Sequence, residues 1–506
     1  MTHRVLPKTE QLPRALYRAA QVRDLDRQVI ERFEVPGAAL MERAGSAAFK
    51  YGYDRWPEVR RCVVLCGTGN NGGDGFVFAL QAQAAGWQVR VLQLGEPDSI
   101  GGDARLFADQ WREAGGHWGP FEQLPPECDL IVDAMLGTGL QRDLGGQYRV
   151  AVEAANRHRA PKLALDLPTG LHADTGVALG GAIRAQATVT FIGLKQGMFT
   201  AEGVDCCGDI RFEGLGVPAA VYAGQVPAAR RVSWSSASDP LAPRVRSSHK
   251  GHFGHLLVVG GDHGYGGAVR LAGEAAARCG AGLVSIATRE AHVAGLLAAR
   301  PELMAHAVDH THALEPLLAA AGVVLVGPGL GTKAWGRALF EAVLRSGRRL
   351  VLDADALNLL ADMPAQARPA PDDWVYTPHP GEAARMLSVC VAEIQGDRFA
   401  AAESLQRRFG GWVVLKGAGS LMTGPARVPP ALCSDGNPGM ASGGMGDVLG
   451  GVIGSLLAQG RAPRDAVEQG VCVHAAAADR AAAAGGERGL LASDLMPQLR
   501  GLMNNR

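Results

Sequence analysis

The stretch "CGTGNNGGDGF", residues 66–76, places five glycines, two asparagines and one aspartate directly after the apolar run "RCVVL" at 61–65. An apolar run that ends in glycines predicts a buried strand followed by a tight loop. A turn that needs positive φ or a close backbone approach would explain the glycines. It would not explain the two amides and the carboxylate, which suggest that the loop binds a polar ligand at the end of the strand.

Gly67, Gly69 and Gly72 formally match the pattern GxGxxG, so a dinucleotide-binding turn is one interpretation of this loop. A glycine turn without any ligand is another. Exposed backbone N–H groups of such a loop suit phosphate, whereas the side-chain oxygens of Asn70, Asn71 and Asp74 suit a cation and hydroxyl groups.

Strand-like runs and helix-like runs alternate along most of the chain. The runs "RCVVLC", "WQVRVLQL", "CDLIVDAML" and "KLALDL" belong to one series, and a second series begins at "HLLVVGG". Such alternation is typical of parallel sheets covered by helices on both faces. The pattern weakens at residues 216–248, where we expect a linker, and the spacing of residues 16–33 predicts an amphipathic helix. We therefore predict two three-layer α/β domains, 1–225 and 226–506.

Composition excludes several classes of partner. The 506 residues carry 50 Lys+Arg and 50 Asp+Glu, so no global charge attracts nucleic acid or an acidic membrane surface. No run of 18 apolar residues suggests a membrane span, and the first residues lack the apolar region of a signal peptide. Nine scattered cysteines do not resemble a disulfide framework. These features favour a cytoplasmic protein with reduced thiols.

Two more aspartates follow predicted strands of the first domain. Asp133 follows "LIV" and precedes "LGTGL", and Asp166 follows "KLAL" and precedes "LPTG". Each could be an ordinary helix cap or turn residue. Because ligands of open parallel sheets bind at the carboxyl ends of strands, we expect Asp74, Asp133 and Asp166 to face one crevice.

Four motifs in order, "VPGAALMERAG", "GNNGGDG", "VDAMLGTGL" and "DLPTG", resemble the epimerase domain of the NAD(P)H-hydrate repair enzymes over residues 15–215. This family interconverts the R and S forms of nicotinamide cofactors that are hydrated at the ring. The resemblance implies that Asp166 acts in acid/base catalysis and that a potassium ion binds Asn71, Asp133 and Thr169. It also implies substrate contacts from Asn70, Asn71, Gly72, Gly73, Asp74, Gly137, Thr138, Gly139, Leu140, Gln141, Arg142, Asp143 and Asp166.

In the second domain, "DGNPGMASGGMGDVLGG" at 435–451 places glycines ahead of an apolar helix, with Asp447 in its first turn. The helix N-terminus suits an anion. Asp447 could cap this helix, or it could accept a proton from a hydroxyl group that attacks phosphorus. "LKGAGS" at 415–420 ends another strand with Lys416, "DADALN" ends a strand in two carboxylates, and "TPHPGE" holds His379 and Glu382. The phosphate-binding sequence GxxxxGK[ST] is absent.

These motifs, together with "HKGHFGHLLVVGG", "GYGGAVRLA" and "GPGLG", resemble the ribokinase-like fold and, within it, the NAD(P)H-hydrate dehydratase domain over residues 245–500. Such enzymes phosphorylate the hydrate and then expel phosphate. The resemblance implies that Asp447 is catalytic. Ser420 stands where the family commonly has Thr, and the hydroxyl group is retained. The resemblance also implies that Ala268, Gly329, His379 and Asp447 bind the hydrate, and that Lys416, Gly417, Ala418, Gly419, Ser420 and Gly446 bind the nucleotide.

The sequence thus predicts a bifunctional repair enzyme whose first domain supplies the S hydrate that its second domain dehydrates. Its expected partners are hydrated NADH and NADPH, ADP with Mg²⁺ as phosphoryl donor, K⁺, and a second copy of the chain. ATP remains an alternative donor. A vitamin or sugar kinase fused to a nucleotide-binding module, a dehydrogenase with Glu96 on the ribose, and a non-catalytic first domain are the other interpretations.

Overall fold

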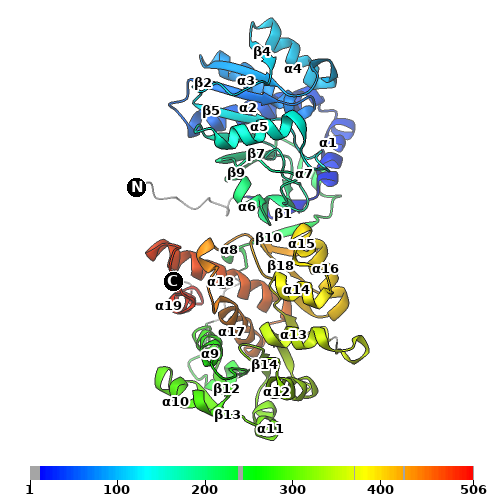
Figure 1. The fold of residues 1–506 in the computed structure, drawn as a ribbon. Coiled ribbons are helices and arrows are strands. Elements are labelled where there is room, and N and C mark those ends of the chain that lie inside the picture. The colour runs from blue at the N-terminus through cyan, green and yellow to red at the C-terminus, as the bar shows by residue number, and fades with distance from the viewer. Residues whose placement is uncertain (1–11, 238–242, 370, 426–427, 505–506) are drawn as a thin grey trace. The chain divides into compact units, whose positions relative to one another are not determined.

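The structure is a computed structural model that describes residues 12–237, 243–369, 371–425 and 428–504 (Figure 1). The chain divides into two compact units, Met1–Arg230 and Arg231–Arg506. Within the described ranges, none of the helices combines the length and the apolar character that crossing a membrane requires.

The first unit is built on a parallel sheet with the strand order β4-β3-β2-β5-β6-β7-β9. Its central strands are buried on both faces, as parallel strands between helix layers must be. All six neighbouring pairs are parallel. The strands are β2 (Arg61–Cys66), β3 (Gln88–Gln93), β4 (His117–Pro120), β5 (Leu130–Ala134), β6 (Lys162–Leu165), β7 (Ala187–Phe191) and β9 (Asp209–Glu213).

Side chains alternate across this sheet and form a separate core on each face. Val64 packs in the core that receives the first four helices, whereas Val63 packs in the core that receives α5. The unit is therefore a three-layer α/β domain. The helices are α1 (Ala19–Phe33), α2 (Gly37–Arg55), α3 (Asn70–Ala84), α4 (Gly102–Glu113) and α5 (Gly146–Arg157).

The strand order reverses between β2 and β5, because the chain runs from β2 outward to β4 and then returns to the other side of β2. The loops that leave these two strands meet at the carboxyl edge. The N–H of Gly67 donates to the carbonyl of Ala134 at 3.1 Å, and a Cβ added to Gly67 would lie 1.9 Å from the carbonyl oxygen of Met135. Only glycine fits this contact, which places both loops over the crevice where ligands of such sheets bind.

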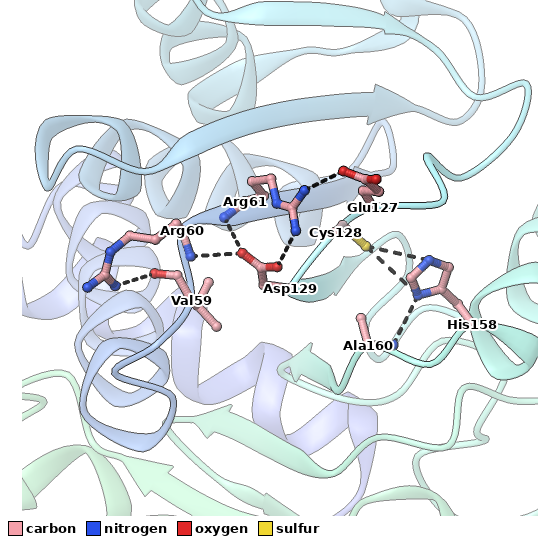
Figure 2. Close-up of polar contacts among 8 residues, drawn as sticks. All are labelled: Val59, Arg60, Arg61, Glu127, Cys128, Asp129, His158 and Ala160. Carbon is pink, nitrogen blue, oxygen red and sulfur yellow. Dashed lines mark hydrogen bonds and ion pairs between the residues drawn. The ribbon is translucent and has the colours of Figure 1, made fainter.

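Ion pairs and hydrogen bonds connect the amino-terminal ends of β2 and β5 (Figure 2). Asp129 accepts hydrogen bonds from the N–H of Arg60 at 3.1 Å and of Arg61 at 2.9 Å, and from the Arg61 guanidinium at 3.0 Å. Nearby, the thiol of Cys128 lies 3.8 Å from His158 Nε2. Burial raises the pKa of the Cys128 thiol to about 11, so this pair holds no reactive thiolate near neutral pH.

The first described element of the unit is a strand that precedes the helix predicted from the sequence. Leu16 and Tyr17 belong to β1 (Ala15–Tyr17), which pairs with β8 (Leu194–Lys195) and β10 (Ala229–Val232), so the predicted helix begins only at Ala19. The described residues of the expected linker, 216–248, contain two short helices, α7 (Ala219–Tyr222) and α8 (Trp234–Ala237), and residues 238–242 lie outside the described ranges. A further short helix, α6 (Gly203–Cys206), precedes them.

The second unit has a sheet with the strand order β13-β12-β11-β14-β15-β16-β17-β18-β19. The strands from β13 to β17 are parallel, and β18 and β19 continue the sheet in antiparallel pairing. The strands are β11 (His255–Val259), β12 (Leu283–Thr288), β13 (Met304–Ala307), β14 (Val323–Val326), β15 (Arg349–Leu352), β16 (Val375–Tyr376), β17 (Trp412–Leu415), β18 (Ser420–Thr423) and β19 (Ala431–Cys433).

Helices cover both faces of this second sheet. One core joins the strands to α9 (Gly266–Arg278), α17 (Met445–Ala458), α18 (Pro463–Gly485) and α19 (Leu495–Leu502). On the other face α11 and α12 contact β11 and β14. The remaining helices are α10 (Glu290–Ala299), α11 (Thr311–Ala320), α12 (Ala334–Arg345), α13 (Ala354–Asp362), α14 (Pro380–Leu387), α15 (Val391–Gly396) and α16 (Arg398–Phe409).

The contact at Gly67 yields a stability prediction. Gly67→Ala forces a methyl group against the Met135 carbonyl and should lower the local free energy of unfolding by about 1–3 kcal/mol. Gly69→Ala is the matched control, since an added Cβ there meets nothing within 4 Å. Hydrogen exchange of peptides from β2 and β5 measures the difference. Equal protection in the two variants would contradict the prediction.

Candidate active sites

A cavity of about 1090 Å³ opens over the carboxyl ends of the strands of the first unit. Its volume is sufficient for a dinucleotide-sized ligand. The cavity is lined by much of the set of substrate-binding residues predicted from the sequence, and also by residues of α1 and α2. The lining residues from the predicted set are Asn70, Asn71, Asp74, Gly137, Thr138, Gly139, Leu140, Gln141, Arg142, Asp143 and Asp166.

Gly72 and Gly73, predicted to bind substrate, do not line this cavity. Both are buried in the first turn of α3, because the helix begins at Asn70 rather than after the glycine loop. An added Cβ would lie 2.1 Å from the Gly67 carbonyl at Gly72, and 2.3 Å from Met41 Sδ at Gly73. Their structural role is therefore to let the first turn of α3 pack against its neighbours.

Asp133 and Thr169 lie beneath the cavity rather than on its wall. Asp133 is fully buried and accepts the N–H of Thr169 at 2.7 Å and its hydroxyl at 2.7 Å. Burial raises the pKa of Asp133 to about 6, and the hydrogen bonds from Thr169 partly oppose this shift.

The side chain of Asn71 is buried, and among the described residues neither its amide oxygen nor its amide nitrogen has a hydrogen-bond partner. A buried amide without a hydrogen-bond partner is a costly arrangement in a protein interior without a ligand. The amide, carboxylate and hydroxyl oxygens of Asn71, Asp133 and Thr169 are the hard donors that alkali cations prefer. The described residues contain no group of three or more His, Cys, Asp or Glu side chains placed to bind a metal.

Asp166 follows β6 and has a left-handed backbone, with φ of 63°. Its carboxylate forms an ion pair with the ammonium group of Lys195, and Lys195 Nζ also donates to Thr190 Oγ1 at 2.9 Å and to the Phe191 carbonyl at 3.2 Å. Lys195 is fully buried, whereas 17% of the Asp166 side chain is exposed. Lys195 therefore binds the Asp166 carboxylate from the protein interior, and the carboxylate of Asp166 stays accessible from the cavity.

Two further carboxylates, those of Asp26 and Asp74, interact electrostatically with Lys195. Burial, opposed by Lys195 and reinforced by Asp166, raises the pKa of Asp26 to about 6. Burial and repulsion from Asp166 and Asp26 raise the pKa of Asp74 well above its usual range. One cation among three carboxylates favours a proton on at least one of them. Sequence reasoning missed Lys195 and Asp26. A lysine inside the apolar segment "TFIGLKQGMF" was the available signal for Lys195.

In the second unit, Asp447 lies in the first turn of α17, where Gly444 caps the helix with φ of 89°. Burial, followed by repulsion from Asp353, raises the pKa of Asp447 to about 7. A carboxyl group with this pKa is matched to taking up a proton near neutral pH.

Lys416 lies beside the same helix start. Its Nζ is 2.7 Å from Asp353 Oδ1 and 3.7 Å from Glu382 Oε2, and a Cβ added to Gly446 would lie 3.3 Å from this Nζ. The structure thus brings together Lys416 and Gly446, which the sequence assigned to the nucleotide. It adds Asp353 and Glu382, which were noted only as strand-end or loop carboxylates.

His379 is the N-cap of α14. Its Nδ1 accepts the N–H groups of Gly381 at 2.9 Å and Glu382 at 3.3 Å, so the neutral ring carries its proton on Nε2. Burial, followed by repulsion from Lys416, lowers the pKa of His379 and favours this neutral form. His379 therefore presents an N–H donor near the Lys416 cluster.

Gly329 and Ala268 are brought together at another part of the sheet edge. The Gly329 carbonyl accepts the N–H of Asp262 at 2.6 Å, and the N–H of Ala268 donates to the Tyr265 carbonyl at 3.2 Å. A Cβ added to Gly329, which has φ of 56°, would lie 2.5 Å from the Cβ of Tyr265. The loops after β11 and β14 therefore pack closely, and glycine is needed where they touch.

Comparison with known proteins identifies the family. A family model described as YjeF-related protein N-terminus matches residues 37–197, and one described as NAD(P)H-hydrate dehydratase matches residues 256–500. The chain is 45% identical over 490 residues to the bifunctional NAD(P)H-hydrate repair enzyme Nnr of Coxiella burnetii, with 97% of this chain and 99% of that protein covered. The chain belongs to the bifunctional NAD(P)H-hydrate repair enzymes.

Two other comparisons agree with this assignment. The repair enzyme Nnr of Escherichia coli is 44% identical over 496 residues, covering 97% of this chain and 95% of that protein. A crystal structure of a ribokinase-like superfamily protein from Enterococcus faecalis matches with a TM-score of 0.50 and 28% identity, covering 55% of this chain and 96% of that chain. The ribokinase-like fold predicted for the second unit is confirmed.

As a repair enzyme of this family, the protein combines an NAD(P)H-hydrate epimerase domain with an NAD(P)H-hydrate dehydratase domain. The predicted family, fold class and bifunctional activity are confirmed. Membership of this family sets aside the interpretations as a vitamin or sugar kinase, a dehydrogenase or a non-catalytic first domain.

The buried Lys195 yields a prediction about stability and pH. Lys195→Met leaves Asp166, Asp74 and Asp26 without their shared cation, and should destabilise the first unit by about 3–5 kcal/mol at pH 7. The loss should be smaller at pH 5, because protonation neutralises carboxyl groups whose pKa values are raised. Urea denaturation at both pH values, followed by pulsed hydrogen exchange of β6 and β7, measures this.

Thr190→Val is the control for Lys195→Met. It removes one hydrogen bond to Lys195 and no charge, so it should cost about 1 kcal/mol equally at both pH values. A Lys195→Met penalty that does not change between pH 7 and pH 5 would contradict the shared-charge interpretation.

Proposed function

We propose that the cavity of the first unit binds the hydrated nicotinamide ring and that Asp166 transfers the protons needed to interconvert R and S. The observation that carries this proposal is the Asp166–Lys195 ion pair at the cavity. Lys195 engages Oδ1, while a Cβ added to Gly137 would lie 3.2 Å from Oδ2. The second oxygen thus faces the loop that lines the cavity.

Inversion requires a bond at the hydroxyl-bearing carbon to break and to form again on the opposite face. Each step needs a proton donor and a proton acceptor, and a carboxyl group that shares one proton with its neighbours can serve as both. Asp74 and Asp26 supply such neighbours, and Lys195 fixes the orientation of Asp166. The lining residues Asn70, Asn71 and Asp74, and those from Gly137 to Asp143, would hold the remainder of the substrate.

We further propose that Asn71, Asp133 and Thr169 hold a potassium ion. The unpaired amide of Asn71 and the buried carboxylate of Asp133 support this assignment, because a monovalent cation would satisfy both. The ion would offset the charge of Asp133 and keep the side chain of Asn71 in place next to the Gly137 loop, where a Cβ added to Gly137 would lie 3.6 Å from Asn71 Cβ.

For the second unit we propose that Asp447 accepts the proton of the hydrate hydroxyl as its oxygen attacks the terminal phosphorus of ADP. AMP is then the leaving group, and loss of phosphate together with a proton from the neighbouring ring carbon yields NAD(P)H. The pKa of about 7 for Asp447 supports this role, because the ionised base is available near neutral pH. His379 and the loops of Ala268 and Gly329 would hold the hydrate.

Lys416 and the loop that follows it would hold the phosphates of the nucleotide. Asp353 and Glu382 next to Lys416 offer the carboxylate oxygens that Mg²⁺ prefers, and together with Asp447 they outnumber the single lysine. Asp353 and Glu382 would supply oxygen ligands to an Mg²⁺ ion that the phosphates also bind, and the ion would help to neutralise the charge of the transferred group. ADP as the donor follows from the resemblance of the motifs.

The test of both halves is NADH recovery from a mixture of R and S hydrate. The unchanged protein with ADP, Mg²⁺ and K⁺ should recover all of it, measured by absorbance. Asp166→Asn should recover NADH only from the S hydrate in the mixture. Asp447→Asn should slow the recovery of NADH by at least about 10²-fold. Mixing the two variants should restore full recovery, since each retains one intact site. ATP in place of ADP tests the choice of donor.

Recovery of the whole mixture by Asp166→Asn at the rate of the unchanged protein would contradict the role of Asp166. Failure of the mixed variants to complement one another would contradict the division of the two activities between the units.

The potassium site predicts a cation effect confined to the first activity. Replacing K⁺ by tetramethylammonium at constant ionic strength should slow epimerisation and leave dehydration of pure S hydrate unchanged. K⁺ should also increase hydrogen-exchange protection of β5, because a ligand of the folded state stabilises it. Asn71→Leu should abolish the K⁺ effect on protection. Equal protection of the unchanged protein in both salts would exclude the site.

A further inference from the structure

The loop from Lys416 to Gly419 connects β17 to β18 and has an unusual backbone. Gly417 has φ of 134° and Gly419 has φ of 66°. The N–H of Lys416 donates to the Pro378 carbonyl at 2.9 Å, and Ser420 Oγ donates to the Gly417 carbonyl at 3.1 Å. Gly417 is exposed whereas Gly419 is buried, and among the described residues the N–H of Gly417 makes no backbone hydrogen bond, so it is available to a ligand.

The guanidinium group of Arg398 lies beneath this loop. Arg398 begins α16 and only 1% of the residue is exposed. Its Nη2 donates to three backbone carbonyls, of Leu415 at 3.3 Å, Lys416 at 3.2 Å and Gly419 at 3.4 Å. Its Nη1 donates to Gln395 Oε1 at 2.9 Å. One buried side chain thus binds the carbonyls on both sides of the loop's tip.

Gly417 lies against the guanidinium group. A Cβ added there would lie 2.9 Å from Nη1 and 3.0 Å from Nη2 of Arg398. The absence of a side chain at this position therefore allows the backbone to approach the charge. Because a trans peptide unit is planar, the Lys416 carbonyl that points to Arg398 places the N–H of Gly417 on the opposite side, away from the guanidinium group.

We propose that Arg398 is a positioning residue for the nucleotide: it binds the Lys416 carbonyl on the inner side of the loop and so directs the exposed N–H of Gly417 toward the phosphates. This inference rests on the proposed assignment of residues 416–420 to the nucleotide. Arg398 acts through the backbone and does not itself touch the ligand.

The charge of Arg398 assists in the same direction. Burial lowers the pKa of Arg398 to about 10, which leaves the group protonated near neutral pH. A positive charge that lies under a phosphate-binding loop, and is shielded from solvent, favours an anion above it. Lys416 adds a second positive charge on the same loop.

The test compares Michaelis constants in the full chain. Arg398→Met removes the donors, and Arg398→Lys keeps the charge but cannot bind three carbonyls at once. Gly417→Ala keeps Arg398 and forces the loop away from it. Each should raise KM for ADP by about tenfold or more, with KM for the S hydrate unchanged. Arg407→Met, an exposed position on the same helix, should change neither constant. Epimerisation by the same chain is the internal control.

A merely structural arginine would give a different pattern. In that case the variants would lose stability, measured by thermal unfolding, while the soluble folded fraction would keep the normal KM for ADP, and the proposal would be overturned. If Arg398→Met does not fold, the same decision is made on Arg398→Lys and Gly417→Ala. If the unchanged protein dehydrates S hydrate without any nucleotide, the nucleotide assignment itself is wrong, and the inference fails with it.

Discussion

The close contact between two backbones at the point where β2 and β5 diverge is the constraint on which the first active site depends. The Met135 carbonyl occupies the space of a side chain at residue 67, so only glycine allows the two loops to meet. From this contact α3 starts with Asn70 and Asn71, and the Gly137 loop closes over Asp166. The positions of the polar groups at the start of α3 and on the Gly137 loop follow from how these two strands end.

In both units, one largely buried lysine lies among several carboxylates. In the first, Lys195 is shared by Asp166 and its acidic neighbours, and in the second Lys416 is shared by Asp353, Glu382 and Asp447. Each lysine interacts with several polar or charged partners, so the removal of one carboxylate does not leave its ammonium group without a partner. Burial, reinforced by the neighbouring carboxylates, raises the pKa of Asp26 to about 6 and that of Asp447 to about 7.

The sequence identified groups that sit at strand ends, because that rule needs only a strand and the residue after it. Asp166 and Asp447 were found in this way or by motif. Lys195, Asp26 and Arg398 were not, because their roles depend on burial and on contacts between distant segments. Arg398 precedes its carbonyl partners by about 20 residues on a helix, and nothing local marks it as buried. The close packing of Gly72 and Gly73, whose role as substrate ligands stays a prediction, likewise depends on contacts that the sequence does not show.

Each unit has its own hydrophobic cores and its own sheet, and both are carried on one polypeptide. Synthesis of the chain therefore delivers the two active sites in equal numbers. A cell cannot adjust one repair step against the other through expression. Any imbalance between the supply of one stereoisomer and its consumption has to be corrected by the turnover numbers of the sites themselves, so mutations that change one rate place selection on the other.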